Sequence, residues 1–248
     1  MTTPPRPLRA RLLAEALGTG FLVAVVVGSG IQAERLSPDD VGLQLLENST
    51  ATALALAALI LCLGPISGAH LNPAVTLAER LTGRTDTPTA VAYVTAQVAG
   101  GCGGALVANL MFELPVVDLS GHDRTSAGML LGEVVATFGL VTVIFGLVHS
   151  GRHAAIPVAV AGYIGAAYWF TSSTSFANPA VTLARTLSDS FAGIAPASAP
   201  GYVAAQAAGA LAAVACSRLL FAQPTETAPM SPSPNGEGES SLQEALDA

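Results

Sequence analysis

The sequence has very little charge. Only 11% of its 248 residues are Asp, Glu, Lys or Arg, whereas a soluble domain carries about 25%. It has no lysine, so all ten basic residues are arginines, and aromatic residues make up only 5%. With a net charge of −7 and no basic patch among aromatic residues, the composition excludes a soluble globular domain and gives no sign of nucleic-acid binding.

Cysteine is also scarce. The three cysteines, Cys62, Cys102 and Cys216, all fall inside apolar runs, so we interpret them as small buried residues and exclude a disulfide framework. The sequence has no metal-ligand cluster, no nucleophile motif and no phosphate-binding loop. We therefore expect no metal, no cofactor and no enzymatic activity. The first apolar run is too long for a cleaved signal peptide and lacks an Ala-x-Ala site.

The abundant feature is apolar sequence, since 51% of the residues are hydrophobic. Each of the long apolar segments is near the roughly 20 residues that cross a bilayer as a helix. Together they predict one membrane domain over residues 10–222. The tails 1–9 and 223–248 are expected to be disordered. The six segments are 10–32, 42–64, 87–112, 126–149, 154–171 and 199–222.

Seven identical residues, Asn-Pro-Ala-Val-Thr-Leu-Ala, occur at 72–78 and again at 178–184. Asn is a good N-cap and Pro suits the first turn, so each copy predicts a helix start. Breakers follow at Gly83 and at Ser188, which leaves about ten helical residues, enough for about half of a hydrocarbon core of about 30 Å. One copy would be an ordinary turn into a helix. Two copies in matching contexts predict half-membrane helices that line a pore.

The chain is duplicated around these motifs. Each half has the order span, span, half-span, span, over residues 10–112 and 126–222. Because each half has three spans, the second half inserts upside down and the half-helices meet tip to tip. Arginine placement favours both termini on the cytoplasmic side. That side would carry Arg6, Arg9, Arg11, Arg80, Arg84, Arg152 and Arg218, and the outer side Arg35, Arg124 and Arg185.

The segment 67–76, Ser-Gly-Ala-His-Leu-Asn-Pro-Ala-Val-Thr, resembles the first signature of the aquaporin and aquaglyceroporin family, the major intrinsic proteins. The resemblance covers about residues 10–222. It implies an all-α membrane protein with six transmembrane helices and two half-membrane helices in an inverted repeat. It also implies a passive channel that assembles as a homotetramer, with one pore per subunit, in the cell membrane.

The pore centre is expected at the two motifs. Asn72 and Asn178 would cap their helices through the side-chain oxygen and leave the amide NH₂ free to donate to a permeating oxygen. The two helix N-termini would make the centre positive, which repels cations and interrupts a chain of protons. The motifs are completed by Pro73, Ala74, Pro179 and Ala180.

Backbone carbonyls before each motif are expected to line the pore. They belong to Gly68, Ala69 and His70 in the first loop and to Ser173, Thr174 and Ser175 in the second. His70 has no partner that would make it a metal ligand, so we interpret it as a brace of its loop.

Glu15 and Glu133 are acids inside apolar spans, each four residues before a Thr. As a proton relay they would indicate a secondary transporter. As acceptors for N–H groups of the pore loops they would be structural, and the symmetric placement and the family resemblance favour this second role.

The selectivity filter is where the chain departs from the family. An Arg follows the second Asn-Pro-Ala in that family, whereas this chain has Val181. The family spacing adds Thr52, Ala166 and Ser175, which predicts a wide, uncharged ring. Arg185 lies one helical turn beyond Val181. It would either add positive potential at the outer mouth or extend to water as a helix-end residue.

A Val at this position resembles bacterial channels associated with arsenic-resistance operons, which pass arsenite. Arsenous acid is neutral at pH 7 and is similar in shape to glycerol. The sequence therefore predicts a passive channel for small neutral solutes: glycerol-like polyols, arsenous acid and related metalloid hydroxides, and water. The alternatives are a water-selective channel, a secondary transporter and a membrane scaffold with a closed pore.

Overall fold

The computed structural model describes residues 6–221, and its six long helices agree with the six predicted spans. All six are long and apolar enough to cross a membrane. The predicted tails lie mostly outside the described residues, although α1 begins at Leu8, inside the predicted N-terminal tail. The helices are α1 (Leu8–Leu36), α2 (Val41–Ser67), α4 (Thr87–Met111), α5 (Ala127–His149), α6 (Ile156–Phe170, after the 3-10 turn η1 at His153–Ala155) and α8 (Ala199–Leu220).

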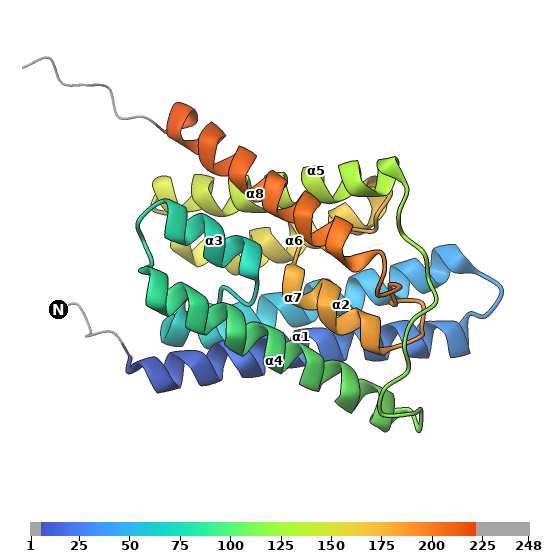
Figure 1. Ribbon diagram of the computed structural model, residues 1–248. Helices are drawn as coiled ribbons and strands as arrows, with labels where there is room; N and C mark the ends of the chain where they lie inside the picture. The colour runs from blue at the N-terminus through green and yellow to red at the C-terminus, as the bar shows by residue number, and fades with distance from the viewer. Residues whose placement is uncertain (1–5, 222–248) are drawn as a thin grey trace, which may run out of the picture.

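Two short helices start at the repeated motifs, α3 (Pro73–Leu81) and α7 (Pro179–Ala184). α7 is shorter because the chain tightens into the 3-10 turn η2 (Arg185–Leu187). Both helices are capped as predicted, since Asn72 Oδ1 accepts from Ala74 N at 2.8 Å and Asn178 Oδ1 from Ala180 N at 3.0 Å. Figure 1 shows α3 and α7 between α4 and α8, and both short helices contact these two long helices.

The first and third spanning helices of each half pack at very close range, α1 with α4 and α5 with α8. Glycines permit this. A Cβ atom added at Gly104 would lie 2.1 Å from the Gly20 carbonyl oxygen, and one at Gly209 would lie 2.5 Å from that of Val134. Small residues at such crossings are how membrane helices bring their backbones together.

The outer surface of the bundle is apolar. Large side chains such as Leu13, Phe21 and Leu131 are more than half exposed, as expected for a surface that faces lipid rather than water. Cys62 is exposed, which corrects the prediction that all three cysteines are buried. An apolar helix in a membrane has a lipid-facing side, so an apolar run does not imply burial inside the protein.

Candidate pore

The two half-helices are tied together at their tips. Asn72 Nδ2 donates to the Ala177 carbonyl at 2.7 Å, and Asn178 Nδ2 donates to the Leu71 carbonyl at 2.8 Å. Each amide therefore uses one of its two hydrogens to hold the opposite loop. This corrects the expectation of a wholly free NH₂ group: one hydrogen on each Asn remains for a permeating oxygen, and both residues line a cavity.

The pore loops have an unusual backbone. Ala69, Leu71, Ser175 and Ala177 have φ between 46° and 50°, in the left-handed region. Non-glycine residues adopt this region at a cost of about 1–2 kcal/mol each. Such loops need partners that hold them, and two buried glutamates provide these.

Glu15 holds the first loop. Its carboxylate accepts hydrogen bonds from His70 N at 3.0 Å and Leu71 N at 2.7 Å, and from the Ser67 hydroxyl at 2.6 Å. Its side chain is fully buried and is not among the residues that line the cavity.

Glu133 holds the second loop in the same way. It accepts from Phe176 N and Ala177 N, both at 2.8 Å. It too is fully buried and away from the cavity lining. These are the contacts that a bracing role requires, whereas a proton relay would need carboxylates that reach the cavity.

Two glutamines complete the braces and were missed from the sequence. Gln97 Nε2 donates to Glu15 at 2.8 Å and to the Thr76 hydroxyl at 3.0 Å. Gln206 Nε2 donates to Glu133 at 2.6 Å and to the Thr182 hydroxyl at 2.8 Å. The sequence did contain a signal, because Tyr-Val-x-Ala-Gln occurs at 93–97 and again at 202–206.

A cavity of about 250 Å³ runs past the two asparagines. It is lined by apolar side chains of the spanning helices and by the pore loops, including Gly68, Ala69, His70 and Ser175. Ser173 and Thr174, which were expected in the carbonyl ladder, do not line it. The apolar lining includes Leu22, Val26, Leu56, Ile60, Leu140, Ile144, Val148, Ile156, Val160, Ile164 and, from the motifs, Val75 and Val181.

His70 acts as a loop contact in this structure. Its Nδ1 lies 3.1 Å from the Thr76 hydroxyl, and its ring packs edge-on against Tyr93 with centroids 5.2 Å apart. Residues 6–221 contain no group of three potential metal ligands.

Three of the four predicted filter residues line the cavity, namely Thr52, Ser175 and Val181. Ala166 does not, because it lies on the exposed face of α6. Tyr168 lines the cavity instead, and its hydroxyl donates to Thr52 Oγ1 at 3.2 Å. The prediction of Ala166 is thus corrected.

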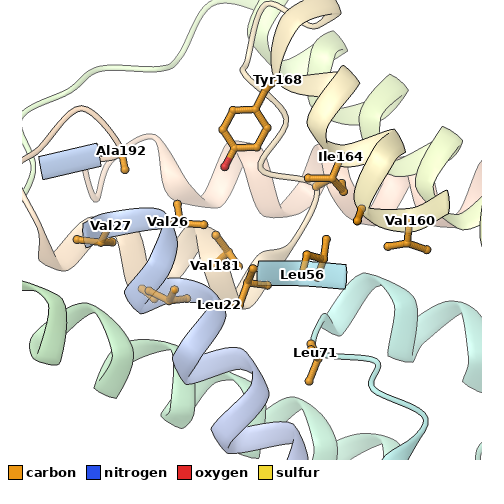
Figure 2. Packing of buried hydrophobic residues seen from close by; sticks show 14 of the residues in the cluster. Leu22, Val26, Val27, Leu56, Leu71, Val160, Ile164, Tyr168, Val181 and Ala192 are labelled. Carbon is orange, nitrogen blue, oxygen red and sulfur yellow. The ribbon is translucent and has the colours of Figure 1, made fainter. Parts of the chain in front are cut away.

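The register of α6 explains the correction. Val160, Ile164 and Tyr168 are spaced by four residues and lie on one helix face. All three line the cavity, and Figure 2 shows the hydroxyl of Tyr168 pointing toward the residues around Val181. Two residues correspond to about 200° of rotation, so Ala166 is directed to the opposite side of the helix.

Arg185, one helical turn beyond Val181, also lines the cavity. It is 2% exposed, its Nε donates to the Ala192 carbonyl, and its guanidinium carbon lies 3.4 Å from the Phe176 ring centroid. The alternative of an arginine that extends to water is therefore wrong. The expected uncharged ring is corrected as well, because this cation lines the same cavity as Val181.

Six spanning helices, with two half-helices that meet at their N-termini beside a lined cavity, define a membrane channel. The chain belongs to the major intrinsic protein family, whose profile matches residues 5–172. This confirms the predicted family and fold class, and family members are channels rather than enzymes.

Relatives and a solved structure agree with this assignment. The chain is 51% identical to aquaglyceroporin AqpS of Rhizobium meliloti (strain 1021), over 86% of this chain and 91% of the relative. It is 37% identical to aquaporin-4 of Bos taurus, over 56% of this chain and 44% of the relative. Its fold is similar to the aquaglyceroporin of Plasmodium falciparum, with a TM-score of 0.67, 21% identity and coverage of 84% and 95% of the two chains.

Proposed function

We propose that this channel passes glycerol-sized neutral solutes, including polyols, arsenous acid and water. The main support is the cavity: hydrogen-bonding groups of the pore loops and apolar side chains line it together, which suits a solute with hydroxyl groups on a small apolar frame. The position after the second Asn-Pro-Ala is Val181, which leaves a side chain without charge there. The AqpS relative is itself named an aquaglyceroporin.

A water-selective channel is the second candidate, and one observation favours it. Tyr168 and Arg185 both line the cavity, so an aromatic ring and a cation are present where the sequence predicted only small, uncharged side chains. A secondary transporter has less support. The two acids in the spans, Glu15 and Glu133, are occupied by loop N–H groups.

Stopped-flow light scattering on proteoliposomes tests these candidates. Under glycerol and arsenite gradients, we expect flux well above that of protein-free vesicles, independent of pH and without saturation. Water flux without glycerol or arsenite flux would reject the proposal in favour of the water-selective channel. Saturable, pH-dependent flux would instead indicate a transporter.

The residue that the sequence predicted for the filter, Ala166, and the residue that lines the cavity, Tyr168, lead to different predictions. Tyr168→Ala removes a ring that lines the cavity, so we expect faster flux of a bulkier polyol such as erythritol, by about tenfold if the barrier falls by about 1.4 kcal/mol. Ala166→Val changes the exposed face of α6, and we expect unchanged flux. Faster erythritol flux in Ala166→Val but not in Tyr168→Ala would restore the sequence-based ring.

We further propose a homotetramer in the cell membrane, with both termini cytoplasmic. The family resemblance supports the tetramer, and the surplus of arginines in the segments on the N-terminal side of the membrane supports the orientation. Asn72 and Asn178, with the two helix N-termini behind them, would supply the field that excludes protons and cations.

A further inference from the structure

Arg185 is a buried cation without a counter-ion. Within residues 6–221, the ion pairs are Arg84–Glu79 and His122–Asp189, and neither includes Arg185. Only its Nε donates a hydrogen bond to a described residue, which leaves the two Nη groups of a cavity-lining guanidinium without protein acceptors. Burying a charge in this way is costly unless a ligand or water compensates it.

The equivalent residue in the first half of the repeat is also charged, but it has a counter-ion. Glu79 occupies the position in the first half that Arg185 occupies in the second, directly after the repeated motif. Both line the cavity, and they lie toward opposite ends because α3 and α7 point away from each other. Glu79 is paired with Arg84 at 3.3 Å, so the uncompensated charge is confined to the Arg185 end.

The surroundings of Arg185 add positive charge. Its guanidinium lies on the Phe176 ring, and the guanidinium carbon of Arg124 lies 5.2 Å from the centroid of the same ring. Arg124 is anchored by Nε to the Gly193 carbonyl at 2.9 Å. Glu133, the acid that holds the neighbouring loop, has both oxygens engaged by N–H donors.

Two hydroxyl-bearing residues, Ser175 and Thr52, line the same cavity. The Ser175 hydroxyl is buried and has no hydrogen-bond partner within the described chain. The Thr52 hydroxyl accepts from Tyr168, so its own hydrogen can donate. Both side chains are at most 3% exposed. Together with the guanidinium they offer donors and no acidic acceptor, which is the chemistry that binds anionic oxygens.

We propose that Arg185, Ser175 and Thr52 form a binding site for small singly charged oxyanions of the carboxylate or sulfonate class. This goes beyond the passage of neutral solutes. An anion bound there would occupy the end of the cavity and slow the flux of neutral solutes. Methanesulfonate is a suitable probe because it is permanently ionised, and dimethyl sulfone is its neutral counterpart of similar shape.

Saturation-transfer NMR on the full chain in detergent tests the site directly. We expect methanesulfonate to bind and dimethyl sulfone to bind at least about tenfold more weakly, since a charge-assisted hydrogen bond contributes more than a tenfold factor in affinity. Arg185→Gln should lose the methanesulfonate signal. Arg35→Gln removes the same charge from an exposed arginine that donates to the Phe112 carbonyl, and it should bind as the wild type does.

Ser175→Ala keeps every charge and the Arg185–Phe176 contact, so it decides the question even if Arg185→Gln does not fold. We expect its affinity for methanesulfonate to fall several-fold. Equal binding of the two probes, or unchanged affinity in Ser175→Ala and Arg185→Gln, would overturn the site.

Flux provides a second measurement. Methanesulfonate at equal concentration on both faces of proteoliposomes should slow osmotic water or glycerol flux in the wild type and not in Arg185→Gln. Absence of glycerol flux together with intact methanesulfonate binding would count against the proposed function and not against this site.

Discussion

Replacing Gly104 with alanine is expected to prevent stable packing of α1 against α4. The added Cβ would lie 2.1 Å from the Gly20 carbonyl oxygen and 2.8 Å from its carbonyl carbon. Both are backbone atoms, so no side-chain rotation relieves the overlap and the helices must separate. Overpacking costs about 1–3 kcal/mol and occasionally more, and this backbone overlap belongs at the upper end. The folded fraction would be measured by size-exclusion chromatography in detergent and by thermal unfolding.

The preceding residue offers a matched control. Gly103 is on the same helix and exposed, and a Cβ there would meet nothing within 4 Å. Gly103→Ala makes the same chemical change and should leave the folded fraction unchanged or slightly higher, since alanine has the better helix propensity. Equal loss of folded protein in both variants would show that helix propensity or insertion, and not the α1–α4 contact, controls the result.

Replacing Glu133 with leucine is expected to abolish flux and destabilise the fold by about 3 kcal/mol or more, because three buried N–H donors lose an acceptor. The change leaves Phe176 N and Ala177 N without their buried acceptor, and Gln206 Nε2 keeps only the Thr182 hydroxyl. A buried group that loses its partner costs about 1–3 kcal/mol. The loop would also lose the contacts that hold Ala177 at φ 46°. Thermal unfolding and glycerol flux would measure the two effects.

Two further variants test whether the effect of Glu133→Leu comes from lost hydrogen bonds to the loop or from a change at any buried polar residue of α5. Glu133→Gln keeps one acceptor oxygen, so its stability should fall between those of the leucine variant and the wild type. Thr137 lies one turn further along α5, is also fully buried, and has a hydroxyl without a partner in the described chain. Thr137→Val should therefore be neutral or stabilising. A leucine variant as stable as Thr137→Val would rule out the bracing role.

Much of the architecture could be predicted because its causes are local. Apolar length is sufficient to predict the spans, and an Asn followed by Pro is sufficient to begin a helix, which is why α3 and α7 start at Pro73 and Pro179. The repetition of the motif implies the inverted halves. Glu15 and Glu133 stood out because an acid inside an apolar helix requires a partner.

The residues that shape one end of the cavity were decided by tertiary structure. Whether Ala166 or Tyr168 faces the cavity depends on how α6 is rotated about its axis, and about 100° per residue separates neighbours. That rotation is set by packing against α2 and α5, which a count from a distant motif does not contain. For the same reason, the sequence alone did not show that Arg185 lines the cavity. Its side chain is held there by the Phe176 ring and the Ala192 carbonyl, which belong to other segments of the chain. Thus sequence determined the frame through local rules, and side-chain direction at the pore was determined by contacts between segments far apart in the chain.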